Sequence, residues 1–181
     1  VAYSKRHGRV VVGGFDRSGG PMGWSVLYLT QDLEIVADVK PGVRGSVTGV
    51  AVDAGGNIYA AGRSGIVKLD SEGRVLNVVG MPQVVKIYAS QEQLPSVGTN
   101  IVAVSDNEVY TLSSDTLSIV DAARLSRGPQ MLSAFIGSMD ADSDNVYLGV
   151  TQITTKDNWN WMVYALRSRG RRLFPRIFLR R

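Results

Sequence analysis

Residues 53–62 read DAGGNIYAAG, and residues 65–76 read GIVKLDSEGRVL. In the first stretch, a polar, glycine-rich turn precedes a short β-prone run that ends at Gly62. In the second stretch, an apolar run is followed by a four-residue polar turn and a second apolar run. These patterns predict short antiparallel strands that are joined by hairpin turns.

Both stretches recur along the chain. Residues 49–62 align without gaps onto residues 1–14, and a third copy of the first stretch, DNVYLG, lies at 144–149. The second stretch recurs at 26–36 and 163–173, and residues 100–120 hold the same alternation of strands and turns in compact form. The sequence therefore predicts four repeats, at about 1–45, 46–81, 82–127 and 128–181, within one domain that spans residues 1–181.

Each repeat has room for four short strands, and helical periodicity is sustained nowhere in the chain. A repeat of roughly 40 residues with four strands is typical of β-propellers. We therefore expect an all-β, β-propeller-like fold of four repeats, each made of four short antiparallel strands. Four blades are at the low end for a closed ring, so the chain is either a four-bladed propeller or a part of a larger one.

The stretch at 53–76 resembles a blade of the NHL-like and SBBP-like β-propeller repeats. The resemblance is strongest in the second repeat, clear in the first and fourth, and loosest in the third. It implies the propeller fold. It does not imply a function, because blades of this kind serve binding proteins and enzymes alike.

Composition excludes several kinds of chemistry. The chain has 181 residues, of which 44% are hydrophobic, and it contains no cysteine, so disulfides, thiolate nucleophiles and cysteine-based metal sites are excluded. No apolar run approaches the roughly 20 residues of a membrane-spanning helix. The N-terminal residues also lack the apolar core of a secretory signal, so we expect a soluble protein whose compartment stays unassigned.

The candidate recognition surface lies in the first and fourth repeats. Their loops between the second and third strands are longer than the one in the second repeat. If four blades closed into a ring, these loops would meet and form a rim suited to ligand binding. The candidate rim residues are Asp16, Arg17, Trp24, Asp157, Asn158, Trp159 and Trp161, with Lys156 beside them. In the alternative interpretation, Trp24 and Trp161 open matched strands and pack between blades as core.

A calcium site is a further hypothesis, because alternate carboxylates in a short loop suit this ion. The candidate ligands are Asp140, Asp142 and Asp144. The run departs from a calcium loop, since Asn145 stands where glycine is usual and no distal carboxylate follows, and a solvated hairpin turn also explains these residues. The only histidine, His7, lies in a predicted turn, where we expect it to be exposed and without a function.

The last fifteen residues contain seven arginines and no acid, whereas the rest of the chain is slightly acidic. One interpretation makes residues 172–179 the last strand of the fourth repeat, with Pro175 at a sheet edge. Another makes the arginines a patch for nucleic acid or an anionic surface. An interface with an acidic partner or an unstructured end is a third. The candidate anion-binding residues are Arg167, Arg169, Arg171, Arg172, Arg176, Arg180 and Arg181.

The favoured function is a non-enzymatic binding or scaffold propeller, whose partner we expect to be a protein. No catalytic residues are assigned, and no cofactor is expected apart from the calcium hypothesis. The alternatives are a propeller enzyme of the lactonase, hydrolase or quinoprotein kind, and binding to nucleic acid or an anionic surface through the arginine-rich end. An open set of blades also invites self-association that completes a larger ring.

Overall fold

The structure is a computed structural model that describes residues 1–18, 22–81, 83–89, 100–105, 108–124, 131–141, 145–154, 159–169 and 172–180. The described residues form sixteen β-strands and no α-helix. Accordingly, this part of the chain contains no helix long and apolar enough to cross a membrane.

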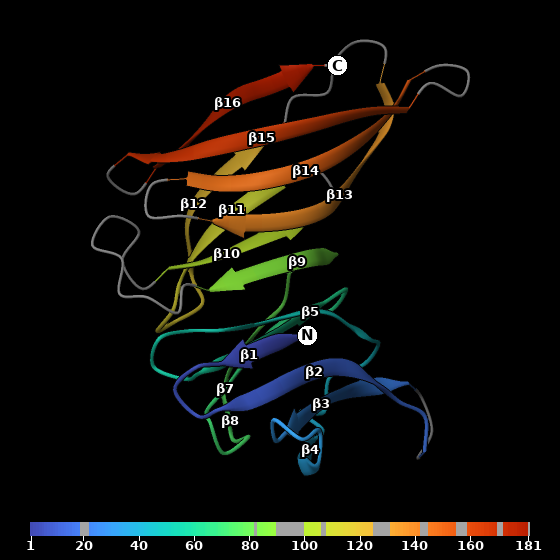
Figure 1. Cartoon of the computed structure of the whole chain (residues 1–181), viewed down its shortest axis with the longest axis vertical. Helices are drawn as coiled ribbons and strands as arrows, with labels where there is room; N and C mark the ends of the chain where they lie inside the picture. The colour runs from blue at the N-terminus through green and yellow to red at the C-terminus, as the bar shows by residue number, and fades with distance from the viewer. Residues whose placement is uncertain are drawn as a thin grey trace.

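The strands form four four-stranded antiparallel sheets, which we call blades 1 to 4 in chain order (Figure 1). Blade 1 contains β1 (Ala2–Ser4), β2 (Arg9–Asp16), β3 (Gly23–Leu29) and β4 (Ile35–Val39). Blade 2 contains β5 (Val47–Val52), β6 (Ile58–Gly62), β7 (Gly65–Leu69) and β8 (Val75–Val79). Blade 3 contains β9 (Val84–Ala89), β10 (Asn100–Ser105), β11 (Glu108–Ser113) and β12 (Ile119–Arg124). Blade 4 contains β13 (Met131–Ala141), β14 (Asn145–Thr154), β15 (Trp159–Arg169) and β16 (Arg172–Arg180). In each blade the strands lie in sequence order, so the prediction of four repeats of four antiparallel strands is confirmed.

Contacts between neighbours join the blades into a row in chain order, with blade 4 at the top of Figure 1 and the overlapping strands of blades 1 and 2 at the bottom. β5 contacts β2 of blade 1 and β9 of blade 3, and β9 also contacts β13 of blade 4. Neighbouring blades therefore pack against each other. Blades 1 and 4 lie at the two ends of this row, so the described strands do not close a four-bladed ring.

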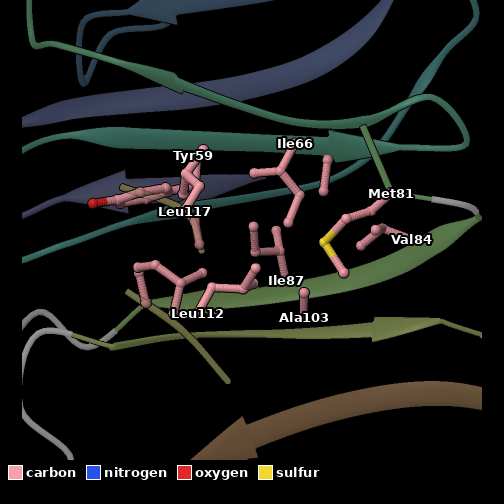
Figure 2. Packing of buried hydrophobic residues seen from close by; sticks show 12 residues of the cluster. Tyr59, Ile66, Met81, Val84, Ile87, Ala103, Leu112 and Leu117 are labelled. Atoms are coloured by element: carbon pink, nitrogen blue, oxygen red, sulfur yellow. The ribbon is translucent and has the colours of Figure 1, made fainter. Parts of the chain in front are cut away.

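Apolar side chains are buried between each pair of neighbouring blades, because residues that alternate along a strand point to opposite faces of the sheet. In β6, Ile58 packs toward blade 1, whereas Tyr59 packs toward blade 3. Figure 2 shows the cluster between blades 2 and 3, where Tyr59 and Ile66 lie opposite Ile87 and Leu112. A third cluster joins blades 3 and 4. Each of these large side chains contributes about 1.5–3 kcal/mol by burial, so packing between blades is a main source of stability.

The turn between the third and fourth strands has the same backbone in three blades. Leu33, Gly73 and Leu117 have φ values of 64°, 85° and 56°, and each precedes the residue whose carbonyl closes the turn. This left-handed conformation is ordinary for glycine and strained for leucine. The two leucines thus take up a turn that only the glycine of blade 2 would have suggested from sequence.

Blade 4 differs from the sequence-based expectation at its second hairpin. β14 continues to Thr154 and β15 begins at Trp159, so Trp159 belongs to a strand and not to a long loop. The β-branched residues of TQIT at 151–154 favour this extension. The interpretation of the arginine-rich end as a last strand is confirmed, because β16 is the outermost strand of its sheet, with Pro175 opposite Leu166.

Candidate functional site

A pocket of about 260 Å³ lies in blade 1, where β2 ends and β3 begins. The connection between β4 and β5 forms its other wall. The residues that line it are Asp16, Gly23, Trp24, Lys40, Gly42, Val43 and Arg44. Two of them, Asp16 and Trp24, belong to the candidate rim that the sequence suggested.

The wall of the pocket is built by a segment that folds back onto β3. The amide of Trp24 donates to the carbonyl of Val43, and the amide of Gly45 donates to the carbonyl of Met22, both at 2.8 Å. Gly42 and Gly45 have φ values of 75° and 102°, which this reversal requires and which other residues rarely adopt. In addition, the hydroxyl of Ser64 in blade 2 donates to the carbonyl of Arg44 at 2.8 Å, so the segment is fixed to both blades.

Trp24 forms the base of this region. Its side chain is only 1% exposed and belongs to the core between blades 1 and 2. The indole lies so close to Gly62 that a Cβ there would be 2.8 Å from Trp24 Cζ2. Trp24 therefore supports the pocket from below, and the surface that a ligand could touch is made by its neighbours.

The only carboxylate that lines the pocket is already paired. Lys40 Nζ lies 2.8 Å from Asp16 Oδ2, and the amide and hydroxyl of Ser18 donate to Asp16 Oδ1 at 2.9 and 2.7 Å. These hydrogen bonds hold the pKa of Asp16 well below its usual range, with the bond from Lys40 as the largest cause, and Asp16 in turn raises the pKa of Lys40. The pocket therefore contains a stable ion pair across the neutral range.

Beside the pocket, apolar and cationic side chains are exposed together. The Arg17 guanidinium lies over the ring of Phe15, 5.1 Å from its centroid, and Phe15 is 51% exposed. Met22 is also exposed, as is Arg44, which has no ion-pair partner among the described residues. We call this surface the blade 1 rim, and it consists of Phe15, Asp16, Arg17, Met22, Lys40 and Arg44. Because Asp16 and Lys40 offset each other, the rim is net positive.

The structure brings together only part of the candidate rim. Asp16, Arg17 and Trp24 lie in blade 1, whereas Trp159 and Trp161 lie in β15 at the opposite end of the row (Figure 1). Asp157 and Asn158 lie outside the described residues. Sequence reasoning missed Lys40 and Arg44, although the glycines of KPGVRG at 40–45 were a signal of a sharp reversal.

The candidate calcium ligands are only partly covered. Asp140 is exposed on β13, while Asp142 and Asp144 lie outside the described residues. Within the described part of the chain, no three acidic or histidine side chains cluster closely enough to hold a metal ion. His7 is exposed as expected, and its ring covers Gly56 of blade 2, where a Cβ would come within 2.2 Å of the imidazole.

The arginine-rich end forms an edge of blade 4. The backbone of Arg167 and Arg169 belongs to β15, and that of Arg172, Arg176 and Arg180 belongs to β16. The strand register places Arg167 opposite Phe174, Arg169 opposite Arg172, and Ala165 opposite Arg176. Arg171 and Arg181 lie outside the described residues.

The fold resembles solved β-propellers. The WD40 domain of Pan2 from Neurospora crassa matches 91% of this chain with a TM-score of 0.62 and 15% sequence identity, over 51% of its own length. A chain of the mitotic checkpoint complex matches 97% with a TM-score of 0.55 and 11% identity, over 49% of its own length. A streptogramin B lyase matches 94% with a TM-score of 0.55 and 9% identity, over 69% of its own length.

These likenesses show a β-propeller fold, and the chain spans about half the length of the first two of these proteins. At such low identity they do not carry over a function. No protein-family model matches the sequence. No curated protein matches it either.

Proposed function

We propose that the protein is a non-enzymatic, protein-binding propeller whose blade 1 rim takes an acidic segment of a partner protein. The observation that carries this proposal is the exposure of Phe15, Arg17 and Arg44 around a pocket whose only lining carboxylate, Asp16, is already neutralised by Lys40. Aromatic residues, methionine and arginine are the side chains that are enriched at protein interfaces.

The size and charge of the pocket support a peptide group as the ligand. At about 260 Å³, the pocket is smaller than the roughly 300–1,000 Å³ of typical small-molecule sites. One acidic side chain of a partner would fit this volume and would meet the Arg44 guanidinium beside the Lys40–Asp16 pair. An aromatic or aliphatic neighbour in the partner would pack on Phe15 and Met22.

The protonation state of the pocket supports binding over catalysis. A general base at neutral pH works best with a pKa near 7, whereas the pKa of Asp16 is held well below its usual range. Similar propellers include both WD40 proteins and a lyase, so the fold alone favours neither function. The presence of one such chain in the mitotic checkpoint complex supports an assembly role by analogy.

Two further assignments belong with this proposal. We assign the blades to the NHL-like or SBBP-like kind on the DAGGN turn of blade 2, where Asp53 Oδ1 accepts the amide of Asn57 at 2.9 Å. We also treat residues 1–181 as one domain, because the apolar clusters are shared between neighbouring blades.

The test uses a fluorescein-labelled peptide of alternating Glu and Leu. A second peptide, in which Gln replaces each Glu, is the uncharged control. We expect fluorescence anisotropy to show binding of the Glu peptide only. Arg44→Glu and Phe15→Ala should each weaken it by at least about tenfold, or about 1.4 kcal/mol. Arg74→Glu makes the same charge change at an exposed position outside the rim and should leave binding unchanged. Equal binding by Arg44→Glu and Arg74→Glu would contradict the proposal.

A further inference from the structure

The outer face of blade 1 carries residues that other blades bury. Blade 2 turns four apolar side chains toward blade 1, and all are almost fully buried: Ile58, Ala60, Val67 and Leu69. The repeat places four apolar residues at the same positions of blade 1, and these are only half-buried: Val10, Val12, Leu27 and Leu29. The difference arises because blade 1 covers blade 2, while no described residue covers the outer face of blade 1.

The turn between the third and fourth strands independently indicates that blade 1 lacks a preceding blade. Leu117 of blade 3 takes a left-handed backbone and is fully buried in the core against blade 2. Leu33 holds the same position in blade 1 with the same strain, yet it is 65% exposed. In blade 2 this position is Gly73, where a Cβ would lie 2.5 Å from Val39 Cγ2 of blade 1. This turn position therefore touches the preceding blade wherever one is present.

The outer face of blade 4 also exposes residues whose counterparts are buried in blade 2, in this case against the blade that follows. Tyr147 holds the position of Tyr59, which is fully buried against blade 3, but Tyr147 is 37% exposed. Val163 holds the position of Ile66, which is also fully buried, but Val163 is 42% exposed. Trp161 lies opposite Thr151 at the register position that corresponds to Trp24. Blade 4 thus presents the face that normally meets the next blade.

The charges of the two faces are complementary. Within the chain, a cation of one blade binds the turn between the third and fourth strands of the next blade. Arg9 Nη1 of blade 1 donates to the carbonyl of Ser71 in blade 2 at 3.1 Å, and Lys68 Nζ of blade 2 donates to the carbonyl of Ser114 in blade 3 at 2.7 Å. Each of these turns is acidic, with Glu72 or Asp115 beside the carbonyl. The corresponding turn of blade 1 carries exposed Asp32 and Glu34, which no described blade faces.

Blade 4 is rich in cations by sequence. The backbone of Arg167 and Arg169 belongs to β15, and that of Arg172, Arg176 and Arg180 belongs to β16. The positive charge of these two strands is opposite in sign to the acidic turn of blade 1.

From these relationships we infer that two copies of this chain pair head to tail, with blade 4 of each copy covering blade 1 of the other. Two such contacts related by a two-fold axis close a ring of eight blades and leave no open face. The contact continues the three blade-to-blade contacts within the chain.

The experiment measures the molar mass of the 181-residue chain by light scattering at micromolar concentration. We expect twice the 19.6 kDa of one chain. Leu27→Asp in the open face of blade 1 and Val163→Asp in that of blade 4 should each give the single-chain mass. Their circular dichroism should stay that of a folded β-protein. Leu76→Asp is the matched control, because Leu76 is an exposed leucine on the outermost strand of blade 2, and this variant should keep the doubled mass.

A single-chain mass for the unmodified protein would overturn the inference, as would assemblies that grow with concentration. A doubled mass that survives both Leu27→Asp and Val163→Asp would also overturn it, because the copies would then meet through another surface. Nucleic acid or anionic vesicles could be added as competitors for the arginines of blade 4. If they bound these arginines and the mass of the protein stayed doubled, the assignment of the arginines to the contact between copies would be wrong.

Discussion

Tyr28 of blade 1 donates its hydroxyl to the backbone carbonyl of Asp70 in blade 2, at 3.3 Å. In the aligned position of blade 2, Lys68 donates to the carbonyl of Ser114 in blade 3. Two chemically different side chains thus each link the third strand of one blade to the last turn of the next, through carbonyls that lie one position apart. The carbonyl of Asp70 also accepts the amide of Gly73 at 3.1 Å, so the hydrogen bond from Tyr28 is its second, and it satisfies the hydroxyl of a tyrosine that is 1% exposed.

We expect Tyr28→Phe to lower the free energy of unfolding by about 0.5–1.5 kcal/mol, because the ring is kept and only the hydrogen bond is lost. Burial raises the pKa of Tyr28, and nearby Asp70 adds to the shift. The unfolded chain therefore loses this proton first, and stability should fall as the pH rises above about 10. Urea unfolding at pH 7 and pH 10.5 measures both effects, and the difference between the two pH values should be smaller in Tyr28→Phe. A variant as stable as the parent, with the same alkaline loss, would contradict this role.

Glycines at the same position of two blades should respond differently to a methyl group. At Gly62 of blade 2, a Cβ would lie 2.3 Å from the carbonyl oxygen of Ser46 and 2.8 Å from the indole of Trp24. At Gly14 of blade 1, no atom lies within 4 Å. Gly62→Ala should therefore cost about 1–3 kcal/mol of unfolding free energy through steric overlap, and Gly14→Ala should cost little. Thermal unfolding of the two variants side by side provides the measurement. Equal melting temperatures would contradict the close packing of Gly62 against Ser46 and Trp24.

The two strained leucines should also differ. Leu117→Gly removes a fully buried side chain, and we expect a loss of about 2–4 kcal/mol that relief of the left-handed strain only partly offsets. Leu33→Gly in the Val163→Asp background, where pairing between copies is removed, takes away an exposed side chain and should change stability by less than about 1 kcal/mol. Chemical denaturation distinguishes them. A large loss on Leu33→Gly in that background would mean that Leu33 is already buried within the single chain.

Binding at the blade 1 rim should depend on pH through the ligand and not through the pocket. Hydrogen bonds lower the pKa of Asp16, so its pair with Lys40 is present above the ordinary carboxyl pKa and is lost only as the pH falls through the lowered value. The Glu peptide itself becomes neutral near pH 4, and we expect its affinity to fall there while the pocket stays intact. Anisotropy titrations from pH 7 to pH 4 test this dependence, with Asp16→Asn as the comparison. Binding that is lost well above pH 5 would be inconsistent with it.

Much of the fold was visible in the sequence because its elements repeat. The ungapped alignment of residues 49–62 with residues 1–14 matches β6 with β2, and both strands begin and end with turns that their Gly and Asn residues favour. The turn at Leu33 and Leu117 was not visible, because leucine does not favour the left-handed backbone.

The candidate site was predicted only in part. Asp16 and Trp24 were singled out from local patterns, but the burial of Trp24 depends on Gly45 and Gly62, which belong to other segments. Lys40 and Arg44 enter the site through backbone hydrogen bonds between β3 and the connection from β4 to β5. The glycines of that connection indicate a reversal of the chain, but not the strand against which it packs. The ring that would have joined Trp24 to Trp161 depends on how the blades are arranged, which a single sequence does not specify.

The most direct test of head-to-tail pairing uses single cysteines, since the chain has none. Leu33 has the turn position that Gly73 has in blade 2, and Phe178 has the register position that Val39 has in blade 1. Val39 would touch a Cβ at Gly73, so Leu33→Cys and Phe178→Cys are the matching pair between two copies. When the two variants are mixed and oxidised, we expect a disulfide-linked heterodimer by mass spectrometry, and little product from either variant alone. Leu76→Cys mixed with Leu33→Cys should give no such product. Absence of the Leu33–Phe178 link in a protein of doubled mass would contradict the central claim that blade 4 of one copy covers blade 1 of the other.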